Sequence, residues 1–185
     1  MQNHDVHSPG TVLWLTGLSG AGKTTIGRLV YLELKSRYSN IVFLDGDELR
    51  EVFGHDHGHT LDDRRKAALR NARLCAMLAA QGIHVVCATI SMFDECRALN
   101  RQKIKNYLEV YIEVPMEVLK KRDQKELYSR AEAGDVKNVI GIDLVPEFPK
   151  SPELVIRNDG SVPPGEQAKQ IVALHKALQS KIDDI

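Results

Sequence analysis

Residues 17–24 read Gly-Leu-Ser-Gly-Ala-Gly-Lys-Thr, which fits the phosphate-binding pattern of glycine, four residues, glycine, lysine and then serine or threonine. The glycines allow the backbone to curl so that its amides converge on a triphosphate. Lys23 would reach the outer phosphates, and the hydroxyl of Thr24 is placed to hold Mg²⁺. The residues expected to bind a nucleoside triphosphate are Gly17, Leu18, Ser19, Gly20, Ala21, Gly22, Lys23, Thr24 and Thr25.

A second group of reactive side chains, Leu-Asp-Gly-Asp-Glu-Leu-Arg at 44–50, follows an apolar run at 41–44. If that run is a strand parallel to the one before the phosphate loop, both motifs emerge at the same edge of the sheet. Asp47 could then orient or deprotonate an attacking hydroxyl, and Asp45 could hold Mg²⁺ directly or through water. Arg50 could neutralise a substrate phosphate. The alternative is an acidic turn that only caps the following helix.

The elements that must position these motifs alternate along the chain. Apolar runs predict strands at 11–16, 41–44, 83–88, 108–114 and 154–156. Helical patterns predict a helix after the phosphate loop, with Ile26, Leu29, Val30 and Leu34 on one face, and further helices at 61–81, 94–106 and 165–181. This alternation predicts an α/β fold of the P-loop NTPase type, with a central, mainly parallel five-stranded sheet between helical layers. In that context a glycine-rich turn without a ligand is disfavoured.

Size and charge indicate one enzyme domain that acts on a small ligand. The 185 residues fit a single domain, 1–185, in which residues 1–10 form a polar N-terminal extension. Lysine plus arginine equal aspartate plus glutamate at 25 each, so no overall positive field favours a long nucleic acid or a membrane surface. Cys75, Cys87 and Cys96 have no metal-like spacing, and no membrane span or secretory signal is predicted. We therefore expect a cytoplasmic protein.

The motifs, taken in order, resemble those of the adenylyl-sulfate kinase family, and the resemblance covers nearly the whole chain. It rests on 17–25, Leu44-Asp45-Gly46-Asp47 with Arg50, Asp63-Arg64 with Arg70, Ala88-Thr89-Ile90-Ser91, Arg122-Asp123, Lys125, Leu127-Tyr128, Gly141-Ile142-Asp143 and Pro152-Glu153-Leu154. The family transfers the terminal phosphate of ATP, with Mg²⁺, to the ribose 3′-hydroxyl of adenylyl sulfate. The resemblance also implies a homodimer.

By position, the resemblance implies a role for each matching residue. Asp47 would lie near the 3′-hydroxyl as the catalytic carboxylate, together with Lys23 of the phosphate loop. A helical lid at about 120–140 would close over the site, and its cations would help to exclude water. The residues implied in acceptor binding are Asp45, Arg50, His59, Arg64, Arg70, Ile90, Ser91, Lys125 and Val139.

Several positions depart from the family pattern around the acceptor base. The family usually carries phenylalanines that sandwich adenine at the positions of His59 and Val139, an asparagine at Ala67 and a proline at Met92. Base stacking on an aromatic ring contributes roughly 1–3 kcal/mol. The pattern Ile90-Ser91-Met92-Phe93 resembles a capsule-associated branch of the family that phosphorylates cytidine diphosphoramidate. Adenylyl sulfate is the first expectation from the family's main activity, and the cytidine nucleotide is the alternative.

Other interpretations apply to particular segments. His55, His57 and His59 alternate and could capture zinc, although a substrate-contacting loop is favoured. The basic helix that contains Arg64 and Arg70 could be a solvated face, and the charged run at 120–125 could be a solvated helix end. A catalytically silent ATP-binding scaffold is the alternative of another class. It predicts damage to the phosphate loop or Asp47, and the sequence shows none.

Overall fold

The computed structural model describes residues 8–54, 58 and 60–184. In this part of the chain, parallel strands form one five-stranded sheet in the order β2-β3-β1-β4-β5. The predicted P-loop-type α/β fold is confirmed. The strands are β1 (Thr11–Thr16), β2 (Ile41–Asp45), β3 (His84–Ala88), β4 (Asn106–Glu113) and β5 (Leu154–Arg157).

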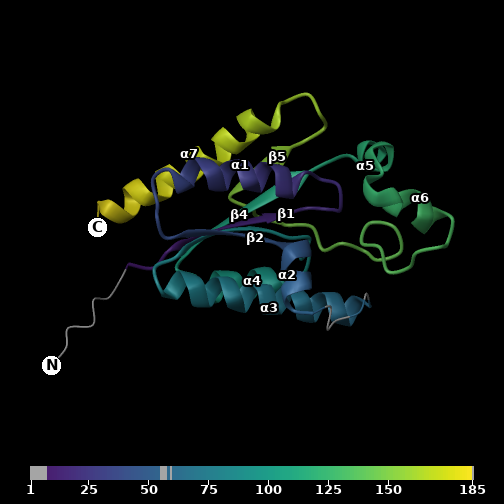
Figure 1. The fold of residues 1–185 in the computed structure, drawn as a ribbon, viewed down its shortest axis with the longest axis horizontal. Helices are drawn as coiled ribbons and strands as arrows, with labels where there is room; N and C mark the ends of the chain where they lie inside the picture. Colours follow the sequence, from purple (N-terminus) through teal and green to yellow (C-terminus); the bar gives the residue numbers. More distant parts are fainter. Residues whose placement is uncertain (1–7, 55–57, 59, 185) are drawn as a thin grey trace.

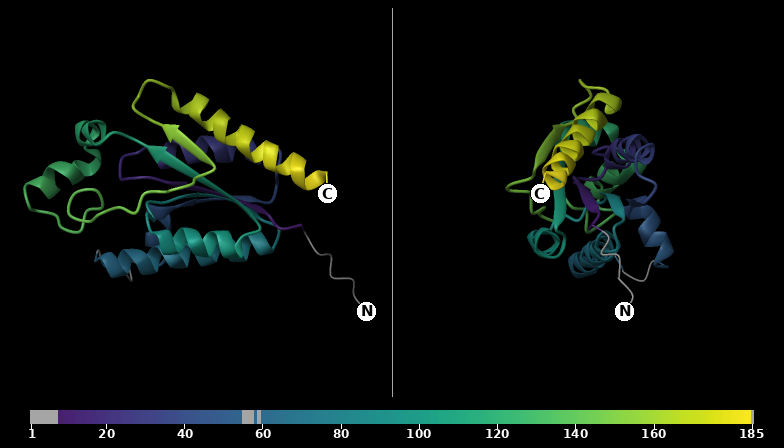
Figure 2. Two further views of the ribbon diagram at one scale, coloured as in Figure 1. Left: turned by 180° about the vertical axis from the view of Figure 1, so that it is seen from behind. Right: turned by 90° about the vertical axis from the view of Figure 1, so that its left-hand side faces the viewer.

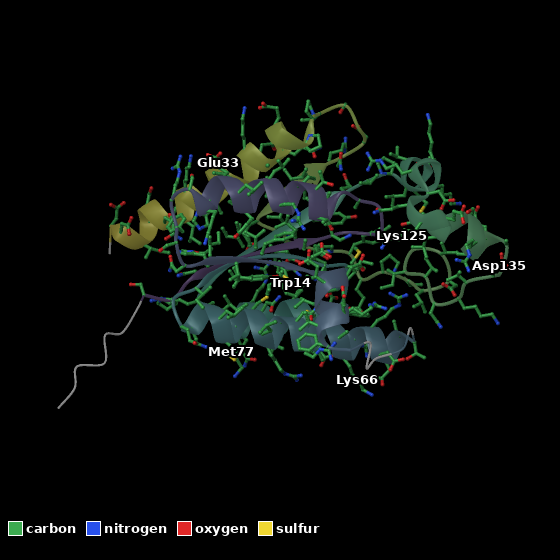
Figure 3. The ribbon with its side chains drawn as sticks, viewed as in Figure 1. Trp14, Glu33, Lys66, Met77, Lys125 and Asp135 are labelled. Carbon is green, nitrogen blue, oxygen red and sulfur yellow. The ribbon has the colours of Figure 1, made fainter. Side chains whose placement is uncertain are left out.

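Helices cover both faces of the sheet (Figure 1). Helices α1 (Lys23–Lys35) and α7 (Pro164–Asp183) pack together on one face, and α3 (Leu61–Ala80) and α4 (Asp94–Lys103) pack together on the other. Both views in Figure 2 keep these pairs on opposite sides. Strand β1 is buried along its whole length, as expected of a strand covered on both faces. Its Trp14 is fully buried and lies in the middle of the sheet (Figure 3).

The predicted elements differ from the observed ones at several boundaries and at one expected core position. Strand β4 begins at Asn106 rather than at 108, because the buried Asn106 pairs with Thr11 and its amide donates to the carbonyl of Pro9 at 2.8 Å. Helix α4 ends at Lys103 rather than at 106 for the same reason. On α1, Leu29 is 37% exposed and does not belong to the core, whereas Ile26, Val30 and Leu34 are buried as expected.

Short helices gather beyond the carboxyl ends of the strands. Helix α2 (Gly46–Val52) follows β2 directly, and the segment after β4 forms α5 (Met116–Arg122), a short 3-10 turn (Gln124–Glu126) and α6 (Leu127–Glu132). We call residues 120–140 the lid segment; it projects beyond the sheet, with Asp135 at its outer end (Figures 1 and 3). The sequence pattern did not separate these helices, because positive φ angles at Asp123, Lys125 and Glu126 break the helical path.

Cys75, Cys87 and Cys96 are buried free thiols, and burial raises the pKa of Cys96 to about 12, which makes it unreactive. Within the described residues, every helix is too short or too polar to cross a membrane.

Candidate functional site

The phosphate loop connects β1 to the first turn of α1. Gly22 has φ +92°, and a Cβ there would meet the amide nitrogen of Asn158 at 2.6 Å, so this position requires glycine. The loop therefore presents backbone amides and the positive end of the α1 dipole on one side. Lys23 is buried and donates to the carbonyl oxygen of Leu18 at 2.8 Å. Burial lowers the pKa of Lys23 to about 8, and the charges of Asp45 and Asp47 partly oppose this shift.

Thr24 and Asp45 meet between the two motifs that sequence analysis singled out. The hydroxyl of Thr24 donates to Oδ2 of Asp45 at 2.6 Å, and Oδ1 of Asp45 accepts from the backbone amide of Asp47 at 2.8 Å. Asp45 thus caps α2, as the structural alternative predicted, and also contacts the phosphate loop. A hydroxyl and a carboxylate oxygen at this spacing fit the oxygen ligands that Mg²⁺ prefers.

Asp47 lies in the first turn of α2 with its side chain exposed. Its Oδ2 accepts from Nζ of Lys125 in the lid segment at 3.1 Å. Both side chains are largely exposed, at 80% for Asp47 and 74% for Lys125, so the ion pair is weakly held and can exchange partners. The structure brings a carboxylate and an exposed cation together at the edge where the phosphate loop ends.

A cavity of about 90 Å³ opens beside Asp47, between α2, α3 and the loop after β3. Six of the residues proposed for catalysis or acceptor binding line it: Asp47, Arg50, Arg64, Arg70, Ile90 and Ser91. Asp45 lies behind it, bonded to Thr24. Asp47 lines the cavity and its backbone amide bonds to Asp45, the partner of Thr24, so an acceptor hydroxyl held at Asp47 would lie near the phosphate loop.

Cations dominate the charge of this cavity. Burial lowers the pKa of Arg64, the nearby charge of Arg50 lowers it further, and Asp143 opposes both. The guanidinium of Arg70 lies 3.9 Å from the ring centroid of Phe53, which holds it by a cation–π contact. Because arginine stays charged in proteins, the cavity presents fixed positive charge suited to an anionic acceptor.

Two further proposed acceptor residues stand apart. Val139 is 2% exposed and lies outside the set of described residues that line the cavity, whereas its neighbour Ile140 lines it. The carboxylate of Asp143 holds this turn, because it accepts from the backbone amides of Asn138 and Val139. His59, together with the rest of the proposed His55/His57/His59 cluster, falls outside the described residues.

The loop after β3 owes its shape to threonine contacts that sequence analysis missed. The hydroxyl of Thr16, at the end of β1, donates to the carbonyl of Ile90, and the hydroxyls of Thr89 and Ser91 lie 2.8 Å apart. Ser91 has φ +29°, a conformation uncommon for residues other than glycine. Phe53 and Thr16 gave no functional signal in the sequence, because each acts through a contact with a residue distant along the chain.

The basic face of α3 is divided between the cavity and other partners. Arg64 and Arg70 line the cavity. Lys66 instead pairs with Asp62 at 2.6 Å on the solvent side, and Arg65 lies near Glu95 and Glu147. The solvated-face interpretation therefore applies to only part of this helix. Among the described residues, no three or more histidine, cysteine and carboxylate side chains gather so that they could hold a metal ion.

Known proteins resemble this chain in sequence and in fold. The family model described as adenylylsulphate kinase matches residues 9–157. The chain is 46% identical over 147 residues to a cytidine diphosphoramidate kinase of Campylobacter jejuni, covering 80% of this chain and 85% of that protein. It is 39% identical over 150 residues to an adenylyl-sulfate kinase of Halothermothrix orenii, covering 81% of each. The Mycobacterium tuberculosis APS kinase CysC, solved with AMPPNP and APS, aligns with TM-score 0.82 and 33% identity over 91% of this chain and 98% of its own.

Proposed function

The chain belongs to the adenylylsulphate kinase family, and we propose that it transfers the γ-phosphate of ATP to the ribose 3′-hydroxyl of a cytidine nucleotide, cytidine diphosphoramidate. As a member of this family it is a phosphotransferase with an alcohol group as acceptor. The observation that carries the proposal is the position of Asp47, which lines the cationic cavity and whose backbone amide donates to Asp45, the partner of Thr24.

We assign the chemical roles from this position. The phosphate loop and Lys23 hold the triphosphate. Asp47 orients the acceptor hydroxyl and takes its proton as the new O–P bond forms and the bond to ADP breaks. Lys125 leaves Asp47 to contact the phosphates, since its exposed ion pair with Asp47 costs little to break. Arg50, Arg64 and Arg70 hold the anionic chain of the acceptor.

The donor set at Thr24 and Asp45 supports Mg²⁺ as the cofactor, with both residues holding it directly or through water. When bound, the ion would neutralise charge on the phosphates. We further propose a cytoplasmic location, which the free buried cysteines and the use of ATP support. A homodimer stays a prediction from the family resemblance, and light scattering coupled to size exclusion measures it.

The choice of a cytidine acceptor rests on the turn at 139–140 beside the cavity, where Ile140 belongs to the lining and Val139 packs next to it. The family usually places a phenylalanine there to stack on adenine, and this chain has a valine that is 2% exposed. Among the described lining residues, Phe93 is the aromatic one, and it is 3% exposed beneath the cavity rather than free to sandwich a base. A pyrimidine has less ring surface to cover. The 46% identity to the C. jejuni kinase supports the same acceptor.

Adenylyl sulfate is the second candidate. It is favoured by the adenylyl-sulfate kinases among the relatives at 36–39% identity and by the intact arginines of the cavity. Both acceptors offer a ribose hydroxyl and an anionic chain, so the donor-side chemistry is shared. They differ at the base and at the terminal group.

The test is direct phosphorylation by the purified protein. Each acceptor is supplied at low concentration with ATP and Mg²⁺, the product is identified by mass, and the modified hydroxyl is located by NMR. We expect phosphorylated cytidine diphosphoramidate in excess, with phosphate on the 3′-oxygen. Faster turnover of adenylyl sulfate would overturn the acceptor assignment, and ATP use with neither acceptor would overturn the function.

A further inference from the structure

Successive carbonyl groups of the phosphate loop are held from outside by side chains of other elements. The amide of Asn158, directly after β5, donates to the carbonyl oxygen of Ala21 at 2.8 Å. The hydroxyl of Tyr128, in the lid helix α6, donates to the carbonyl oxygen of Ser19 at 2.8 Å. Asn158 and Tyr128 are 7% and 1% exposed, so both contacts are shielded from water.

The orientation of Asn158 is fixed by its own hydrogen bonds to α7 and to the sheet. Nε2 of Gln167, on α7, lies 3.3 Å from Oδ1 of Asn158 and donates to it. This contact forces the amide nitrogen of Asn158 toward Ala21, and Gln167 is itself 1% exposed. The backbone amide of Asn158 donates to the carbonyl of Glu113 at 2.8 Å, which fixes the residue to the sheet. The donor facing the loop is therefore held rigidly.

Because each peptide is planar, a carbonyl that bonds outward leaves the next N–H on the inner side of the loop. In a trans peptide the carbonyl and the following N–H point in opposite directions, and no peptide bond in the described residues is cis. Holding the carbonyl of Ala21 outward therefore directs the N–H of Gly22 inward, and holding that of Ser19 directs the N–H of Gly20 inward. The intervening peptide behaves in this way: Gly20 accepts from Arg122 at 3.4 Å, and the N–H of Ala21 turns inward to the carbonyl of Leu18 at 3.2 Å.

From this geometry we infer that Asn158 and Tyr128 are positioning residues for the nucleotide: they orient the amides of the phosphate loop without touching the reacting atoms. Tyr128 also ties the loop to the lid segment, so the donor site and the lid share one contact. The inference rests on the proposed use of ATP, and it concerns binding of the phosphates rather than the choice of acceptor.

Two substitutions test the inference with little change in shape. In Asn158→Asp, a carboxylate oxygen replaces the donor and faces the carbonyl of Ala21, so kcat/KM for ATP should fall about 100-fold, as expected when a reactant is misplaced. In Tyr128→Phe only one oxygen is lost, and about a tenfold fall is expected. The KM of the acceptor should not change in either variant. Tyr107→Phe is the control, because it removes a buried hydroxyl bonded to Asn100 near the amino end of β4, away from the phosphate loop at the carboxyl end of β1.

Binding of inorganic tripolyphosphate, measured by titration calorimetry, separates loop orientation from contact with the base. We expect both variants to lose affinity for tripolyphosphate as they do for ATP. Unchanged tripolyphosphate affinity, or a lower melting temperature with a wild-type KM for ATP, would overturn the inference. If Asn158→Asp does not fold, Tyr128→Phe decides alone. Because this readout needs no acceptor, it stands even if neither proposed acceptor is phosphorylated.

Discussion

The donor and acceptor halves of the site are built in different ways. Around the phosphate loop, the contacts are made largely by buried side chains and backbone, as in the bonds of Asn158, Tyr128 and Lys23 to loop carbonyls. Around the acceptor cavity, long charged side chains from α2 and α3 converge, and two of the positions that face a base in the family have changed. Phosphoryl transfer needs one donor geometry, whereas a cavity whose arginines hold the anionic chain of the acceptor tolerates a new base. The difference indicates that acceptor choice can change while the catalytic frame stays the same.

The largest expected effect follows substitution of Asp47, which should slow phosphoryl transfer without changing ATP binding. Asp47→Asn removes the proton acceptor and keeps the shape, so kcat should fall by about 10³-fold, within the usual range for a general base. Affinity for ATP should stay the same, because Asp47 touches the acceptor side. Glu48→Gln is the matched control, since this neighbouring carboxylate is exposed and pairs with Arg28. Rates of product formation and ATP binding are measured together, and undiminished turnover in Asp47→Asn would remove Asp47 from the mechanism.

A smaller effect is expected at Arg64, on the acceptor side alone. Arg64→Gln removes a charge that lines the cavity, and hydrogen bonds to charged groups contribute about 1.5–3 kcal/mol. The KM of the acceptor should therefore rise roughly 10- to 100-fold, while the KM of ATP is constant. Lys66→Gln, on the solvent side of the same helix, should leave both constants unchanged. An equal rise in the two KM values for Arg64→Gln would break the separation of the halves.

A pH profile probes the donor side through Lys23. Burial lowers the pKa of Lys23 to about 8 in the free protein, so the ammonium is present below that pH and is lost above it. We expect kcat/KM for ATP to fall about tenfold per pH unit above pH 8, as a single essential proton requires. When ATP is saturating, kcat should begin to fall only at a higher pH, because bound phosphate favours the ammonium form of Lys23. A flat kcat/KM profile up to pH 10 would contradict the role of Lys23.

The smallest expected effect concerns Phe53, which stacks on Arg70. Exposed cation–π contacts contribute about 0.5–1 kcal/mol. Phe53→Leu should accordingly raise the KM of the acceptor about threefold and leave ATP kinetics alone, whereas Phe53→Tyr should retain the wild-type value. Initial-rate kinetics with each substrate varied in turn distinguish these outcomes. A loss that Phe53→Tyr fails to rescue would assign Phe53 a packing role instead.

The predictable parts of this molecule are those encoded locally. The buried run at β1, the glycine pattern of the phosphate loop and the aspartates after β2 each lie within a few consecutive residues, and the fold confirms their placement. The contacts of Asn158 with Ala21 and of Tyr128 with Ser19 join residues 137 and 109 positions apart, so no local sequence pattern predicts them. The breaks in the lid segment arise from left-handed residues without glycine, which sequence patterns do not predict.

The most direct test of a changed acceptor on a constant donor site is the ratio of kcat/KM for cytidine diphosphoramidate to that for adenylyl sulfate, in wild type and in Val139→Phe. We predict a wild-type ratio well above one. Val139→Phe should lower it about tenfold, since base stacking contributes roughly 1–3 kcal/mol, with the KM of ATP unchanged. A wild-type ratio below one would contradict the account. So would a changed KM of ATP with an unchanged ratio in Val139→Phe.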